Sequence, residues 1–136
     1  MLNSNRAKIA LYTISSVALI YHVLIITRII DFKNTWGGQL QNLEQMYFFE
    51  AFSIIVQLLV VGLITISTRY FETPRFNRTV TNLLFIFAAI MLLNTIGNLF
   101  AIEAFEKFAF TPLTFLSSIC FGYLGMQRLK HPANIK

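Results

Sequence analysis

The stretch "MYFFEAFSIIVQLLVVGLITIST", residues 46–68, decides the fold class of this protein. A helix needs about 20 mainly apolar residues to cross the roughly 30 Å hydrocarbon core of a bilayer. This run is long enough, and its single charged residue is Glu50. Ser53 and Gln57 follow Glu50 at helical spacing, so the three side chains share one helix face. The segment predicts a transmembrane helix. Its acid raises the question of whether this polar face contacts the bilayer or other parts of the protein.

The composition extends this prediction to the whole chain. Hydrophobic residues make up 56% of its 136 residues and charged residues only 12%, whereas soluble domains have about 45–50% and about 25%. The mean hydropathy is +0.64. The net charge of +5 comes from basic residues at the ends of apolar runs, which is typical of membrane topology. We therefore expect membrane lipids as partners and no nucleic acid.

Three further apolar runs are long enough to span a bilayer, at residues 7–30, 80–102 and 108–126. The first run has no small-residue cleavage site at its end, so we interpret it as a retained helix and not as a signal peptide. Together with residues 46–68, these runs predict an all-α protein, a single membrane domain over residues 1–136. Its architecture would be a four-transmembrane-helix bundle.

The orientation follows from the lysines and arginines in the short connections. Three basic residues, Arg28, Lys33 and Lys107, belong to the connections on one side of the predicted bundle. The other eight basic residues belong to the other side; they are Arg6, Lys8, Arg69, Arg75, Arg78, Arg128, Lys130 and Lys136. The N-terminus and the C-terminus are therefore both predicted to be cytoplasmic.

The polar residues of the predicted spans gather in their outer halves, with Asn82 as the chief exception. In residues 108–126, Thr111, Thr114 and Ser118 form one stripe. Because hydrocarbon offers no hydrogen-bond partners, such side chains turn towards the interior of a bundle. We therefore expect an outward-facing polar cluster that binds a small molecule or lipid. Its candidate ligand-binding residues are Glu50, Gln57, Asn94, Asn98, His22 and Thr114.

Each of these features also has a purely structural interpretation. Glu50 could lie at the membrane interface and reach the lipid headgroups, or it could be a buried functional acid. Arg28 could neutralise Glu50, or it could pair with Asp31 on a helix end. The segment 36–38, Trp-Gly-Gly, could be an interfacial turn or a lid over the cluster with glycine hinges.

The sequence assigns no catalytic residue, metal or cofactor. Cys120 is the only cysteine, and no Cys/His spacing fits a zinc site. Phosphate-binding loops and nucleophile motifs are also missing from the sequence. His22 would need Glu50 or Glu103 beside it to bind a metal. A solvated cap is the expected role of Glu103, Glu106 and Lys107.

The string "TWGGQL…EQMYFFEAFSI…LLNTIGNLFA…FEKFAFTPLT" resembles the small four-helix bacterial integral membrane proteins that are usually left uncharacterised. The resemblance covers most of the chain and implies a multi-pass protein of the cell membrane, specifically the bacterial inner membrane. It implies no activity. The chain is also similar to DoxX-like proteins in size and helix number. EXPERA-domain proteins place acids in a four-helix membrane cavity, and Glu50, Asn94, Asn98 and His22 are similar residue types.

Three functions remain open at this point. The first is binding, or help in transport, of a small molecule or lipid; transport would need a homo-oligomer or a partner membrane protein, because four helices are few. The second is a membrane-embedded enzyme that uses Glu50, with His22 or Glu103, as acid and base. The third is a structural or assembly subunit without a ligand site. With no nucleophile or metal motif, a non-enzymatic role is favoured.

Overall fold

The computed structural model describes residues 3–67, 69, 73–101 and 104–130. Each of the four long helices is long and apolar enough to cross a membrane, counting α4 together with the turn before it. The predicted all-α, multi-pass membrane architecture is thereby confirmed. The long helices are α1 (Ser4–Ile26), α2 (Leu43–Ile66), α3 (Pro74–Leu99) and α4 (Thr111–Lys130), and the short turns are η1 (Phe32–Asn34), η2 (Trp36–Gly38) and the π-helical η3 (Glu106–Phe110).

The helix ends differ from the predicted ranges because capping residues set them. α1 begins before residue 7, since the side chain of Asn3 accepts a hydrogen bond from the backbone N–H of Arg6 (2.8 Å). α2 begins before residue 46, since Asn42 accepts one from the N–H of Gln45 (2.9 Å).

The remaining ends differ for other reasons. α3 begins well before residue 80, with Pro74 in its first turn, where a missing N–H carries no penalty. α1 ends before residue 30, and Arg28 just beyond it has a left-handed backbone (φ 62°). α4 continues to Lys130, beyond the predicted residue 126.

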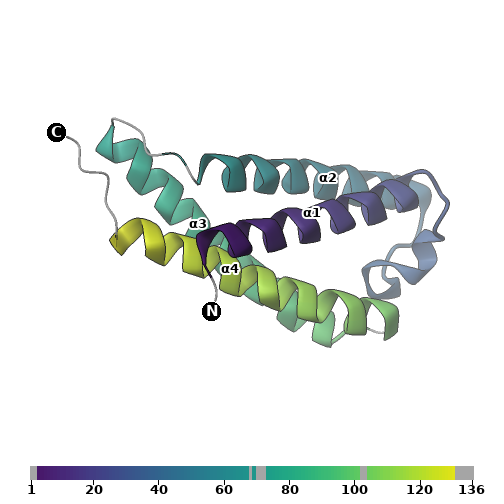
Figure 1. Cartoon of the computed structure of the whole chain (residues 1–136). Helices are drawn as coiled ribbons and strands as arrows, with labels where there is room; N and C mark the ends of the chain where they lie inside the picture. Colours follow the sequence, from purple (N-terminus) through teal and green to yellow (C-terminus); the bar gives the residue numbers. More distant parts are fainter. Residues whose placement is uncertain (1–2, 68, 70–72, 102–103, 131–136) are drawn as a thin grey trace.

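The four helices form two antiparallel hairpins. α1 packs along α2, α3 packs along α4, and the hairpins meet mainly where α1 contacts α4 (Figure 1). α2 and α3 barely contact each other and diverge from their connection (Figure 1). We call the end with residues 27–42 and η3 the loop end. The terminal end is the one where α1 begins, α4 ends and α2 is joined to α3.

The larger of two buried apolar clusters lies towards the terminal end, and a smaller one of Ile25, Leu40 and Met46 lies at the loop end. The fully enclosed members of the larger cluster come from all four helices and include Leu11, Ile64, Leu84 and Phe121. The start of α1 and the end of α4 lie at this same end (Figure 1), which is the arrangement that an even number of spans requires. The cytoplasmic assignment of the terminal end stays a prediction.

A buried arginine closes the terminal end. Arg128 of α4 donates hydrogen bonds to the backbone oxygens of Ser67 (2.7 Å) and Arg69 (2.8 Å) and to Asn77 Oδ1 (2.9 Å). It thereby provides hydrogen-bond partners for two carbonyl groups just beyond the C-terminal end of α2. The sequence analysis counted Arg128 only as a topology signal, but the structure gives it a packing role.

Candidate functional site

Glu50 lies inside the protein and does not reach out to headgroups. Its exposed fraction is 0%. Trp36 Nε1–H donates a hydrogen bond to Glu50 Oε1 (2.7 Å), and His22 Nδ1 lies 2.7 Å from Glu50 Oε2. Of the two interpretations of Glu50, burial is therefore the one that the structure bears out. Both carboxyl oxygens have a partner, as a buried carboxyl group requires.

The partners of Glu50 come from two different elements. His22 lies on α1, near its C-terminal end, and α1 runs alongside the start of α2. Trp36 begins η2, and it has a left-handed backbone (φ 55°), followed by Gly37 (φ 65°) and Gly38 (φ 74°). Glycine adopts this conformation freely, whereas tryptophan does so only under strain. The turn is thus shaped so that the indole reaches Glu50.

A cavity of about 750 Å³ lies between the two hairpins, towards the loop end. Ligand pockets in proteins usually measure about 300–1,000 Å³. Five of the six candidate residues line it, and all four helices contribute; they are His22, Gln57, Asn94, Asn98 and Thr114. Glu50, the sixth, does not line the cavity; it forms a hydrogen bond with His22, which does. The other five residues therefore border one cavity, and their role in ligand binding stays a prediction.

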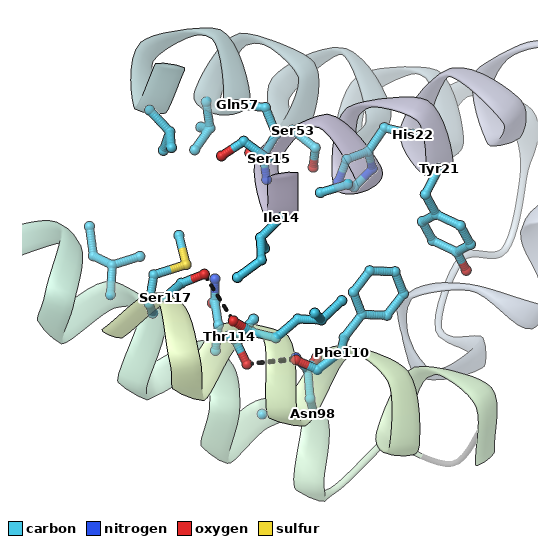
Figure 2. A pocket seen from close by; sticks show the side chains of 18 of the residues that line it. Ile14, Ser15, Tyr21, His22, Ser53, Gln57, Asn98, Phe110, Thr114 and Ser117 are labelled. Carbon is cyan, nitrogen blue, oxygen red and sulfur yellow. Dashed lines mark hydrogen bonds between the residues drawn. The ribbon is translucent and has the colours of Figure 1, made fainter. Parts of the chain in front are cut away.

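The polar groups face each other across the cavity. Ser15, His22, Ser53 and Gln57 project from the α1–α2 side, and Asn98, Thr114 and Ser117 from the α3–α4 side (Figure 2). Residues nearer the terminal end make the deep part apolar; they are Leu11, Val60, Phe87 and Phe121. At the loop end, Thr35, Trp36, Gly37 and Gln39 border the cavity. The part of the cavity nearer the terminal end is thus apolar, and the polar groups lie towards the loop end, beside the aromatic rings of Tyr21 and Phe110.

The cavity wall carries hydrogen-bonding groups but few charges. Among the described residues that line it there is no Asp, Glu, Lys or Arg, and His22 is the only titratable side chain besides Tyr21. If the Glu50 carboxylate accepts from Nδ1–H, a neutral His22 ring keeps Nε2 as a hydrogen-bond acceptor. Serine hydroxyls and the side-chain amides of Gln57, Asn94 and Asn98 add both donors and acceptors.

Some of these polar groups also hold helices together. Thr114 Oγ1 accepts hydrogen bonds from Thr95 Oγ1 (3.0 Å) and from Asn98 Nδ2 (3.4 Å), and it donates to the Phe110 carbonyl (2.9 Å). These contacts join α3 to α4 beside the cavity (Figure 2). Asn98 and Thr114 therefore serve the α3–α4 packing as well as the cavity wall. Asn94 is exposed on α3 where it borders the cavity.

Three expectations about neighbouring residues need correction. Glu50 is paired with His22 and Trp36, and not with Arg28. Arg28 and Asp31 lie beyond the end of α1, so they do not pair on a helix; the Asp31 side chain instead accepts from the Lys33 N–H (3.1 Å). The Trp36 turn is more than an interfacial anchor, because its indole is bonded to Glu50.

The polar stripe of α4 is displaced from the predicted one. Ser117 lines the cavity next to Thr114, whereas Ser118 donates to the Ala88 carbonyl of α3 (2.8 Å). The spacing of the serines alone leaves this ambiguous, because adjacent residues differ by only about 100° around a helix. Glu103 and the side chain of Glu106 lie outside the described residues, so the predicted cap is not described; Lys107 is partly buried.

The part of the chain that the structure describes contains no cluster of side chains that could hold a metal ion. No group of three or more His, Cys, Asp or Glu side chains comes together there. His22 has Glu50 beside it, as one alternative required, but the pair lacks a third ligand among these residues. Two roles of site residues were missed from the sequence. Tyr21 lines the cavity, and Trp36 is a hydrogen-bond donor to the acid.

Comparisons with known proteins identify no relative of this chain. No family model, curated protein or solved structure matches the chain. Membership of the DoxX-like or EXPERA families is therefore not supported by a match. The description of the chain as a four-span membrane protein rests on the helices themselves.

Proposed function

We propose that this membrane protein binds a small molecule in the cavity between its two hairpins. The observation that carries the proposal is the convergence of His22, Gln57, Asn94, Asn98 and Thr114, from four helices, on one cavity of about 750 Å³. Polar groups at membrane depth are unfavourable unless they have partners. A ligand with its own hydrogen-bonding groups would provide such partners, and the apolar depth of the cavity would hold an apolar part.

Two glycines allow a matched test of this proposal. Gly97 lines the cavity, whereas Gly62 lies on α2 away from its wall. A Cβ atom at either position would meet no atom within 4 Å. Gly97→Phe should therefore fill cavity space, and Gly62→Phe should place the same ring on the outer surface. Both variants replace a helical glycine, so their effects on the helices are comparable.

The measurement is the set of small molecules that stays with the protein during purification from membranes, extracted and identified by mass spectrometry. We expect a molecule that the parent and Gly62→Phe retain and that Gly97→Phe loses. Circular dichroism and gel filtration would verify that both variants keep the fold. If all three proteins carry the same molecules in the same amounts, the cavity is not a binding site.

The His22–Glu50 pair favours a second candidate, a membrane-embedded acid/base enzyme. A carboxylate that holds one nitrogen of a histidine orients the ring and sets which nitrogen accepts a proton. His22 borders the cavity, so the pair could exchange a proton with a bound molecule. Turnover that is lost in Glu50→Gln while ligand retention persists would support this candidate. A purely structural role predicts neither retention nor turnover.

A further inference from the structure

The four helices around the cavity do not pack equally closely against one another. α1 contacts both α2, its partner in the first hairpin, and α4 of the second, but α2 and α3 barely contact each other. Figure 1 shows these two helices diverging towards the loop end. Residues from both helices nevertheless line the cavity, among them Val56 of α2 and Ile90 of α3. The cavity therefore lies where α2 and α3 make few contacts with each other.

Two large apolar side chains of α2 and α3 that line the cavity are exposed, as is the polar Asn94 of α3. Phe52 of α2 is 58% exposed and Leu93 of α3 is 66% exposed, and both also line the cavity. Each belongs to a helix that can span a membrane. In a bilayer, these side chains are solvated by lipid chains and not by water. On this side of the molecule the cavity wall therefore faces hydrocarbon.

The interior of the cavity restricts the head of the ligand. Moving a charged head from the headgroup region into this site would be unfavourable, because the described lining residues carry no Asp, Glu, Lys or Arg to pair with it. Hydroxyl, carbonyl and amide groups, by contrast, match the serines, amides and imidazole of the wall. The polar groups of the cavity lie towards the loop end, and its apolar part lies nearer the terminal end.

We propose that the cavity opens sideways between α2 and α3 and takes, from the bilayer, a single-chain amphiphile with an uncharged hydrogen-bonding head. The head lies among His22, Asn98 and Thr114. One part of the chain lies against the apolar depth, and the rest continues between α2 and α3 into the lipid. This inference rests on the proposed function and specifies the ligand class and its route of entry.

The only tryptophan of the chain makes this testable, because Trp36 lines the cavity. The probe is a long-chain monoacylglycerol brominated near its head, mixed into phosphatidylcholine vesicles that contain the protein. Bromine atoms quench a nearby indole, and a probe that is practically insoluble in water reaches the site only through the bilayer. Lysophosphatidic acid and a primary alkylamine with the same brominated chain supply an anionic and a cationic head at equal mole fraction.

We expect the monoacylglycerol to quench Trp36 more than either charged probe, with loss of this excess in Gly97→Phe and its retention in Gly62→Phe. Unbrominated monoacylglycerol should relieve the quenching. Equal or stronger excess quenching by a charged probe overturns the uncharged head and leaves the proposed function standing. If every probe quenches Trp36 to the same extent in the parent and in Gly97→Phe, the proposal that the ligand enters the cavity from the bilayer is overturned. The extraction experiment decides the proposed function separately.

Discussion

A carboxyl group enclosed at membrane depth needs hydrogen-bond donors from the protein, because hydrocarbon supplies none. Glu50 has two partners, at 2.7 Å each, from an imidazole and an indole. The arrangement fixes the ring of His22 beside the cavity. It also holds Trp36 in a backbone conformation that tryptophan seldom adopts. The hydrogen bond between Glu50 and His22 can be tested directly through the tautomer of the histidine.

Replacement of Glu50 by Gln should change the tautomer of His22. With the amide oxygen facing the Trp36 N–H, the amide nitrogen faces His22 Nδ1, which then must accept a hydrogen bond and leave the proton on Nε2. Nitrogen NMR of ¹⁵N-histidine-labelled protein, in a His131→Gln background that leaves a single histidine, reads this change. An Nδ1 signal that is protonated equally in the parent and in Glu50→Gln contradicts the assignment.

At the scale of elements, close contact joins α3 to α4. A Cβ atom on Gly125 would lie 3.0–3.1 Å from the ring of Phe85, whereas one on Gly122 would lie 4.0 Å from the Ala88 Cβ. The first distance is tighter than most real Cβ contacts, so the Phe85 ring would have to shift by a few tenths of an ångström, whereas the second is ordinary van der Waals contact. The absence of a side chain at Gly125 thus allows α4 to pack closely against α3.

Gly125→Ala should therefore lower the free energy of unfolding by about 1–3 kcal/mol through overpacking. Gly122→Ala should leave it unchanged or raise it by up to about 1 kcal/mol, because alanine favours the helix. Thermal unfolding of both variants in the same detergent measures the difference. Equal melting temperatures would show that the Phe85 ring moves aside without penalty.

A second element-scale contact is made by Arg128, which joins the end of α4 to the connection between α2 and α3. Arg128→Met should reduce the free energy of unfolding by at least about 2 kcal/mol, because it leaves buried hydrogen-bonding groups without their charged donor. Lys130→Met, an exposed change two residues later, is the control. The same thermal unfolding measurement applies, and equal effects of the two substitutions would refute the packing role.

At the scale of the whole molecule, the orientation in the membrane is open to a labelling experiment. Asn5 near the start of α1 and Gln41 before α2 are both exposed, at opposite ends of the bundle. In a Cys120→Ser background, a membrane-impermeant maleimide should label Gln41→Cys on intact cells and Asn5→Cys only after permeabilisation. The reverse pattern would overturn the predicted cytoplasmic termini.

The sequence predicted the number of helices well, because apolar length is a strong signal. Polar side chains in spans have few alternatives to the bundle interior, and one cavity is bordered by His22, Gln57, Asn94, Asn98 and Thr114. The features that the sequence did not predict depend on the connection between α1 and α2 and on how the helices pack. The left-handed turn that carries Trp36 to Glu50, and the sparse contact between α2 and α3, follow from tertiary packing that periodicity does not encode.

The bond between Glu50 and His22 also bears on the order of membrane insertion. The ribosome delivers α1 before α2, so the imidazole is already present when the acid arrives. An unpartnered charged residue within a span is unfavourable, by about 2.5–3.5 kcal/mol at the centre on insertion scales, and Glu50 lies in the first third of α2. Glu50 has a hydrogen-bond partner, His22, in the preceding helix, so we expect α1 and α2 to enter the bilayer as one unit. In that case the acid serves biogenesis before it serves any ligand.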